Sequence, residues 1–203
     1  MTLMTVSDVP AGAQAPSLET LLTRSSNNML TEPVPSDRDL ETIFQAATRA
    51  PDHGRLRPWR FVVIKGEARQ EFVKVLQAAT KARKPEATES DLKLLANKFL
   101  MQPMIIAVGA KVTEGKIPEI EQVLSAGAAA MNILNAIHAL GFAGKWVTGD
   151  NCYDPNVNAA LGFTRPDRLI GFIYVGTEKM KLPAMERPNP TDFVTEWKGP
   201  AAG

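Results

Sequence analysis

One stretch of the sequence, residues 104–112, decides the fold, and it reads MIIAVGAKV. Its apolar residues follow one another instead of alternating with polar ones. A strand of this kind is buried on both faces, because both rows of its side chains must leave water. We therefore predict a central strand in a sheet that carries helices above and below. The run LIGFIYV at residues 169–175 predicts a second strand that is buried in the same way.

Helical signals surround these two strands. The S-x-x-D pattern of Ser36 and Asp39 predicts a capped helix that Pro51 stops. A long Ala-rich and Leu-rich helix is predicted from about residue 117 to 140, with Gly141 as its C-terminal cap. The expected order is two helices, a strand (59–64), two helices, the 104–112 strand, the long helix, a short strand (145–148), a short helix and the 169–175 strand. This order predicts an α+β or α/β sandwich with a small sheet covered on both faces.

The composition excludes several classes of function. The 203 residues include 23 Lys and Arg against 22 Asp and Glu, a formal net charge of +1. This balance gives the chain no general attraction to nucleic acid or to an anionic membrane, and we expect neither as a partner. The longest apolar segment, residues 126–142, contains Asn132, Asn135 and His138, and falls short of the roughly 18 uninterrupted apolar residues of a membrane span.

Reactive side chains are scarce. The single cysteine, Cys152, argues for a reducing compartment, and we expect a cytoplasmic protein. The two histidines stand in no hydrolase or zinc signature, so neither a catalytic triad nor a bound metal is predicted. Gly144-Lys145 is followed by Trp146, where a P-loop requires Ser or Thr. A nucleotide-like cofactor would have to bind by another route.

The two ends of the chain differ from its interior. Residues 1–16 carry no basic cluster and no sustained apolar stretch, which predicts a flexible arm without a targeting signal. Residues 17–177 are the predicted folded domain. Residues 178–203 contain four prolines together with Phe193 and Trp197. Aromatic side chains in an extended arm need a surface to cover them, and we expect a partner subunit to provide it.

Four strings of the sequence resemble the nitroreductase family of FMN-dependent oxidoreductases. In chain order they are LLTRSSNNMLTEPVP (21–35), ATRAPDHGRLRPWRFVVI (47–64), GFAGKWVTGD (141–150) and LIGFIYVGT (169–177). The likeness is closest to a small bacterial branch of NAD(P)H nitroreductases, in which APDH and PW occur in this arrangement. It implies an α+β fold, a three-layer α/β/α sandwich with a small central sheet, assembled as a homodimer with shared active sites.

The resemblance also implies which residues bind FMN. The family's Arg-x-Ser element falls on residues 24–26. The loop of residues 49–53 is implied to reach the flavin of the other subunit, and residues 146–149 to lie beside the flavin ring. The implied cofactor-binding residues are Arg24, Ser25, Ser26, Asn28, Arg49, Pro51, His53, Trp146, Val147, Thr148 and Gly149.

The chemistry of the first group suits a phosphate and a ribityl chain, which call for a guanidinium and hydroxyl groups. Ser25 and Met29 stand where many family members carry further Arg residues, so a second cation would be needed. Candidates are Lys179, Lys181 and Arg187. Ordinary structural roles also remain open: Arg24 can bind the carbonyls at a helix end, His53 can be a turn residue, and Trp146 can pack in the core. For Trp59 we expect a structural role.

The activity implied is that of an FMN-dependent NAD(P)H oxidoreductase. NADH or NADPH would donate a hydride to flavin N5, and a small nitroaromatic or quinone-like acceptor would then take electrons in a ping-pong sequence. The cofactor carries the chemistry, so no catalytic side chain is predicted. Two alternatives stay open: a flavin reductase or dedicated dehydrogenase on the same fold, and a non-catalytic flavin-binding dimer. The second is motivated by Ser25 and Met29, and by Arg57, which stands where larger family members carry a Gln before Pro-Trp.

Overall fold

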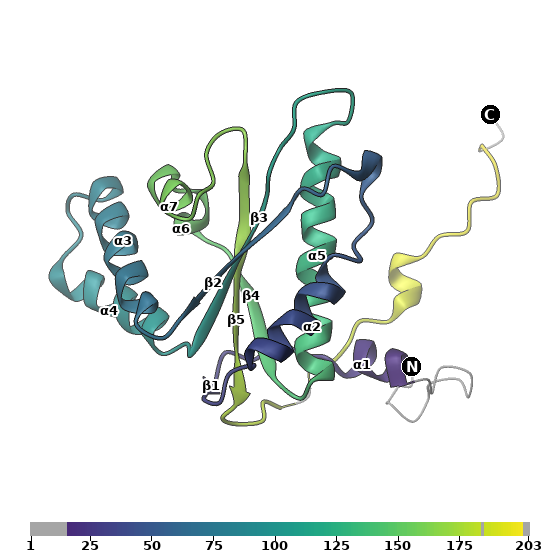
Figure 1. The fold of residues 1–203 in the computed structure, drawn as a ribbon. Coiled ribbons are helices and arrows are strands. Elements are labelled where there is room, and N and C mark those ends of the chain that lie inside the picture. The colour runs from purple at the N-terminus through teal and green to yellow at the C-terminus, as the bar shows by residue number, and fades with distance from the viewer. Residues whose placement is uncertain (1–15, 184, 201–203) are drawn as a thin grey trace. The chain divides into compact units, whose positions relative to one another are not determined.

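The computed structural model describes residues 16–183 and 185–200, so that all but the last residue of the expected N-terminal arm lies outside it (Figure 1). The described chain forms two compact units. The larger comprises residues 24–180, and the smaller joins the residues up to 23 to those from 181 onward. Among the described residues, no helix is long and apolar enough to cross a membrane.

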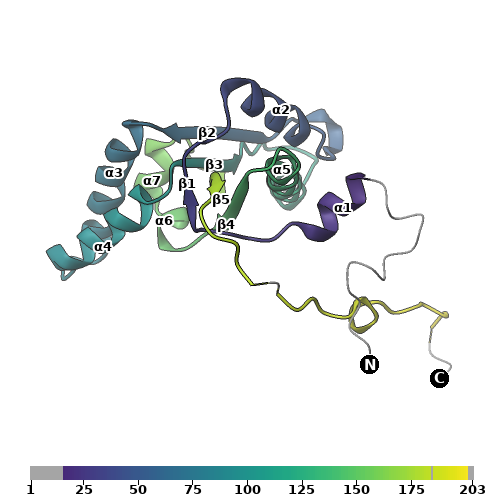
Figure 2. The ribbon, with the colours of Figure 1, turned by 90° about the horizontal axis from the view of Figure 1, so that it is seen from below.

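The larger unit is a three-layer sandwich, as Figures 1 and 2 show from two directions. Helices α3, α4, α6 and α7 cover one face of its sheet, and α2 and α5 cover the other. Within the described residues the strands are β1 Leu30–Thr31, β2 Trp59–Lys65, β3 Met104–Ala110, β4 Ala143–Val147 and β5 Arg168–Glu178. The helices are α2 Asp37–Ala47, α3 Ala68–Arg83, α4 Glu89–Leu100, α5 Glu119–Ala139, α6 Asp150–Tyr153 and α7 Pro155–Ala160, with a 3-10 turn, η3, at His53–Arg55.

The strand from residue 104 is central, as predicted. β3 pairs antiparallel with β2 on one side and β5 on the other, and all seven of its residues are buried. β5 supplies both cores by alternation: Phe172 and Tyr174 join Phe72 and Phe99 on the α3–α4 face, while Ile173 and Val175 join the α2–α5 face. Consecutive apolar residues are therefore needed on these strands, because each face of the sheet has its own core.

The predicted capping signals are present, although α2 ends at Ala47, before Pro51, and α5 begins at Glu119. Ser36 and Asp39 form a complete capping box at α2, Asp154 caps α7, and Gly141 follows α5 with φ at +82°. Three features were not predicted: strand β1, helix α6 and the start of β4 two residues earlier than expected. β1 exists only through its register with residues 177–178 of β5, a pairing between distant segments that no local pattern reveals.

The smaller unit contains helix α1, Pro16–Thr23, and a 3-10 turn η4, Pro190–Phe193, which Asn189 caps. The first of the two helices expected before the 59–64 strand is therefore present. Phe193 and Trp197 are 75% and 82% exposed. These two aromatic side chains of residues 178–203 are thus exposed to solvent. Their exposure agrees with the expectation that a partner subunit covers them.

Candidate functional site

Residues 24–28 lie against the start of β4. The backbone N–H of Asn27 donates to Gly144 O at 3.1 Å, and the Asn27 amide donates to Glu178 Oε1 at 2.6 Å and to Met180 O at 3.0 Å. Asn27 is 1% exposed, and its Oδ1 accepts from Met29 N. This residue, which was not predicted as functional, anchors the segment. The side chains on either side of it are consequently held at the surface.

Polar groups flank that anchor. Ser25, Ser26 and Asn28 are exposed, and none of their side chains makes a hydrogen bond to another described residue. The Lys179 N–H donates to Met29 O at 2.8 Å, and Lys179 and Asn28 line one cavity of about 330 Å³. Lys181 and Arg187 belong to the smaller unit. Of the three cations considered from the sequence, Lys179 lies in the larger unit and shares a cavity with Asn28.

Trp146 is turned into the sandwich. Its indole Nε1 donates to Ile170 O at 3.3 Å, and the ring occupies space that a side chain at Gly171 would fill. A Cβ on Gly171 would come within 2.7 Å of Trp146 Cδ1, and the φ of Gly171 is +153°. Trp146 and Val147 are half-buried, whereas Thr148 and Gly149 are exposed. The side chain of Trp146 thus has a structural role.

Thr148 and Gly149 open into a cavity of about 250 Å³ between the end of β4 and the α3–α4 pair. Three cations line it: Arg83, Lys84 and Lys98. Tyr174 also lines it. The Tyr174 hydroxyl is buried without a hydrogen-bond partner among the described residues, and burial raises its pKa to about 12.

These residues were missed from the sequence. Lys98 looks like an ordinary solvated charge on a helix, and Tyr174 like one more residue of a buried strand. Only the packing of α4 and β5 against the end of β4 brings them to Thr148 and Gly149. No signal within 20 residues of the GFAGKWVTGD string could have identified them.

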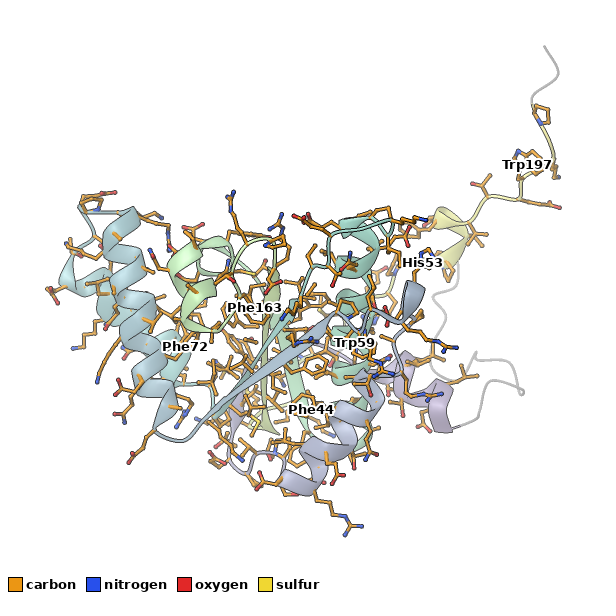
Figure 3. All side chains as sticks on the ribbon, turned by 45° about the horizontal axis from the view of Figure 1, so that its top comes forward. Phe44, His53, Trp59, Phe72, Phe163 and Trp197 are labelled. Atoms are coloured by element: carbon orange, nitrogen blue, oxygen red, sulfur yellow. The ribbon has the colours of Figure 1, made fainter. Side chains whose placement is uncertain are left out.

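The loop of residues 49–53 lies against the N-terminal half of helix α5. Pro51 O accepts the Ser125 hydroxyl at 2.6 Å, and Ser125 Oγ accepts Trp59 Nε1–H at 2.9 Å. The imidazole of His53 is 2.6 Å from Glu121, in the first turn of α5 (Figure 3). Trp59 is therefore structural, as expected. Arg49, Pro51 and His53 are all exposed.

The 49–53 loop and residues 24–28 consequently lie apart in one chain. Residues 24–28 and 146–149 share strand β4. The 49–53 loop contacts α5 at Ser125, whereas residues 24–28 contact Gly144, beyond the end of α5 at Ala139 (Figure 1). Helix α5 alone separates those contacts by about 21 Å, at 1.5 Å per residue. One chain does not bring the loop to residues 24–28.

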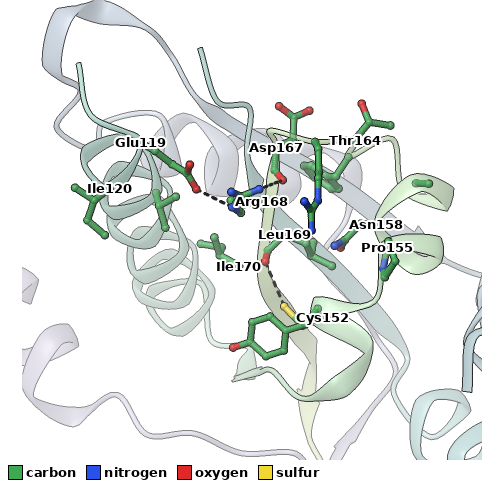
Figure 4. A pocket seen from close by; sticks show the side chains of 15 residues that line it. Glu119, Ile120, Cys152, Pro155, Asn158, Thr164, Asp167, Arg168, Leu169 and Ile170 are labelled. Atoms are coloured by element: carbon green, nitrogen blue, oxygen red, sulfur yellow. Dashed lines mark hydrogen bonds and ion pairs between the residues drawn. The ribbon is translucent and has the colours of Figure 1, made fainter. Parts of the chain in front are cut away.

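The most spacious cavity described here lies elsewhere. Figure 4 shows it between the start of α5, helices α6 and α7, and the start of β5, with a volume of about 890 Å³. An ion pair of Arg168 with Glu119 at 2.7 Å crosses it. Buried Cys152 lines it, and burial raises the pKa of that thiol to about 11, so it is a neutral thiol at pH 7. No predicted cofactor residue lines this cavity.

Comparisons with known proteins agree with this architecture. The structure matches the nitroreductase-like protein of Bacillus cereus with a TM-score of 0.78 at 22% identity, covering 98% of this chain and 100% of that one. It matches a Desulfovibrio desulfuricans structure, described as a "putative nitroreductase in complex with FMN", with a TM-score of 0.71 at 23% identity over 92% and 99% of the chains. At such identities these matches establish the fold.

Sequence comparison goes further. The Escherichia coli protein named "Putative NAD(P)H nitroreductase YdjA" is 39% identical over 180 residues, which are 88% of this chain and 97% of that protein. A Haemophilus influenzae protein named "Putative NAD(P)H nitroreductase" is 38% identical over 181 residues, again 88% and 97%. The family model described as "Nitroreductase family" matches residues 23–177. The chain therefore belongs to the nitroreductase family.

Proposed function

We propose that this chain is an FMN-dependent NAD(P)H oxidoreductase that works as a homodimer, with each flavin site shared between two copies. The observation that carries the proposal is the arrangement along β4. Exposed polar groups (Ser25, Ser26 and Asn28) lie at its start, and an open cavity with three cations lies at its end. Gly144 and Thr148 are four residues apart, about 13 Å along a strand. FMN is elongated, with a phosphate at one end and a ring at the other.

The groups at the start of β4 fit the phosphate end. Arg24 carries a half-buried guanidinium, Ser25 and Ser26 carry exposed hydroxyls, and Lys179 adds a second cation that shares a cavity with Asn28. Charge-assisted hydrogen bonds from Arg and Lys are the strongest that a phosphate receives from side chains. Asn27 holds this segment in place through its hydrogen bonds to Gly144 and to Glu178.

The groups at the end of β4 fit the ring. FMN, when bound, supplies hydride transfer between a nicotinamide donor and an acceptor. The chain's own part is to orient the ring with Thr148 and Gly149 and to place positive charge beside it with Lys98. A nearby cation favours an electron-rich ring. Donor and acceptor would use the same opening in turn, and nitroaromatic or quinone-like compounds are the proposed acceptors, in the cytoplasm.

Three features support the homodimer. The loop of residues 49–53 is remote from residues 24–28 of its own chain, and a second copy would bring such a loop to a flavin bound there. Helix α5 exposes Ile120, Leu124 and Met131 by 59%, 64% and 38% along one side. An apolar stripe on the longest helix is a surface that a symmetric partner can cover. The exposed Phe193 and Trp197 of residues 178–203 would pack on that partner.

The test begins with the visible spectrum and molar mass of the purified protein, with FMN added. We expect a yellow dimer with one flavin per chain, bleached anaerobically by NADH or NADPH and reoxidised by nitroaromatics or quinones. A colourless protein that takes up no FMN would refute the proposal. A yellow protein that neither nucleotide bleaches would instead be a flavin-binding dimer without turnover. To test the shared site, the variant Leu124→Glu should give monomers that lose flavin.

A further inference from the structure

Arg83 joins three helices of the larger unit. It lies in the last turn of α3, and its Nη2 donates to Asn151 Oδ1 in α6 at 2.9 Å. Its Nη1 donates to the carboxylate of Asp154, the residue between α6 and α7. The Asp154 side chain is 1% exposed, so this ion pair is shielded from water on the acidic side. A fork of two hydrogen bonds therefore fixes α6 relative to α3.

Asp154 uses both of its oxygens. Oδ1 accepts from Asn156 N at 2.8 Å and from Val157 N at 3.2 Å, which caps α7, while Oδ2 accepts from Arg83. Burial disfavours the carboxylate, but the Arg83 hydrogen bond and the two backbone N–H groups outweigh burial and hold the Asp154 pKa below its usual value. Asp154 is thus a fixed anion, and it does not line the cavity at Thr148 and Gly149.

The segment before α7 is also attached to α6 itself: the Cys152 N–H donates to Gly149 O at 2.8 Å, and the Cys152 side chain is buried. Strand β4 ends at Val147, and Gly149 has φ at +120°, where a side chain would be strained. A glycine in this position allows the Thr148–Gly149 backbone to adopt other orientations unless α6 is held. The neighbouring pair of Lys84 and Asp150, 3.2 Å apart, is exposed on both sides and contributes little.

We propose that Arg83 and Asp154 are positioning residues for the flavin site: by clamping α6 to α3 they set the orientation of Thr148 and Gly149, and through it the affinity for the flavin ring. This inference rests on the proposed function. Arg83 also lines the cavity, so its positive charge could act directly on a ligand there. The two roles make opposite predictions for a change at Asp154.

The decisive variant is Asp154→Asn. Asn is as good an N-cap as Asp, so the α7 cap is kept while the negative charge is lost. If Arg83 acts by its charge alone, the freed guanidinium lends more charge to the cavity, and FMN binds as tightly as before or more tightly. If the clamp positions Thr148 and Gly149, FMN binds about tenfold more weakly, which corresponds to the loss of one charge-assisted hydrogen bond.

Two measurements separate this inference from the proposed function. Hydrogen exchange of residues 148–151 in the FMN-free protein reports the clamp without any flavin, and FMN titration by fluorescence reports the affinity. We expect faster exchange and weaker FMN binding for Asp154→Asn. We expect the same two changes, but smaller, for Arg83→Lys, which keeps one ion pair. Asp91→Asn, which neutralises the cap partner at the start of α4, is the matched control and should leave both unchanged.

Unchanged exchange at residues 148–151, or unchanged or tighter FMN binding by Asp154→Asn, would overturn the inference. Equal losses in the Asp91→Asn control would overturn it too, since they would reflect general destabilisation. Should Asp154→Asn fail to fold, Arg83→Lys decides by the same two measurements. A wild-type protein that binds no FMN refutes the proposed function, while the exchange comparison still reports whether the clamp exists.

Discussion

Strands β3 and β4 belong to one sheet but are used in different ways. β3 pairs with a strand on each side, and every one of its residues is buried. Among the described strands β4 pairs only with β5, most of its residues are half-buried, and Gly144 accepts a hydrogen bond from Asn27. A strand enclosed on all sides contributes stability. An edge strand keeps backbone groups that pair with no further strand. Here the polar segment of residues 24–28 and the residues that follow β4 lie beside such a strand.

The strongest test of this contrast is a cavity in β3. Ile106 is fully buried between β2 and β5 on the α2–α5 face. Ile106→Ala should lower the free energy of unfolding by about 3–4 kcal/mol, through lost transfer energy and an unfilled cavity. Val147→Ala in half-buried β4 should cost less than about 1.5 kcal/mol. Urea unfolding measures both, and equal losses would contradict the assigned roles of the two strands.

The second test disrupts the contact between Gly171 of β5 and Trp146 of β4. A Cβ at Gly171 would collide with the Trp146 indole and lie 2.8 Å from Val147 O, and the φ of +153° is unfavourable for alanine. Gly171→Ala should therefore destabilise the fold by about 2–3 kcal/mol and displace Trp146, which near-ultraviolet circular dichroism detects. Gly115→Ala is the control, because its added Cβ meets nothing within 4 Å. A harmless Gly171→Ala would mean that Trp146 is not fixed by this contact.

The contrast also explains how much the sequence could reveal. The run MIIAVGAKV predicts a central strand because burial on both faces is written in consecutive residues. The capping patterns at Ser36 and Asp154 are equally local. The pairing of β1 with β5 depends on segments almost 150 residues apart, and helix α6 has only four residues. Neither leaves a periodic pattern that could be read in advance.

The candidate site divides in the same way. The strings at residues 24–28 and 146–149 could be located by resemblance, and the structure places both groups along β4. Lys98 and Tyr174 reach the same cavity from α4 and β5, and their place there follows from packing between elements, although Tyr174 belongs to the LIGFIYVGT string. The ordinary structural reading was correct for Trp59 and also describes the Trp146 side chain.

The third test removes the guanidinium beside the start of β4. Arg24→Ala should weaken FMN binding at least about tenfold, since a charge-assisted hydrogen bond to a phosphate is worth roughly 1.5–3 kcal/mol. Arg38→Ala, an exposed arginine on α2, is the control and should bind normally. Fluorescence titration of FMN measures both. Unchanged occupancy in Arg24→Ala would remove the phosphate site from this edge of the sheet.

The smallest effect concerns pH, and it separates the α6–α7 region from the centre of the sheet. The Asp154 pKa is lowered in the folded protein from a reference value of 3.8, so its carboxylate stabilises the fold above that reference. The stabilisation is lost as the pH falls through the lower folded pKa. The difference in unfolding free energy between wild type and Asp154→Asn, about 1–2 kcal/mol at pH 7, should therefore shrink steadily below about pH 4.

Ile106→Ala is the control. It involves no titrating group, so its loss of unfolding free energy should stay constant over the same pH range. Urea titrations at several pH values compare the two variants, and a difference for Asp154→Asn that did not change with pH would mean that the carboxylate charge contributes nothing to holding α6 and α7.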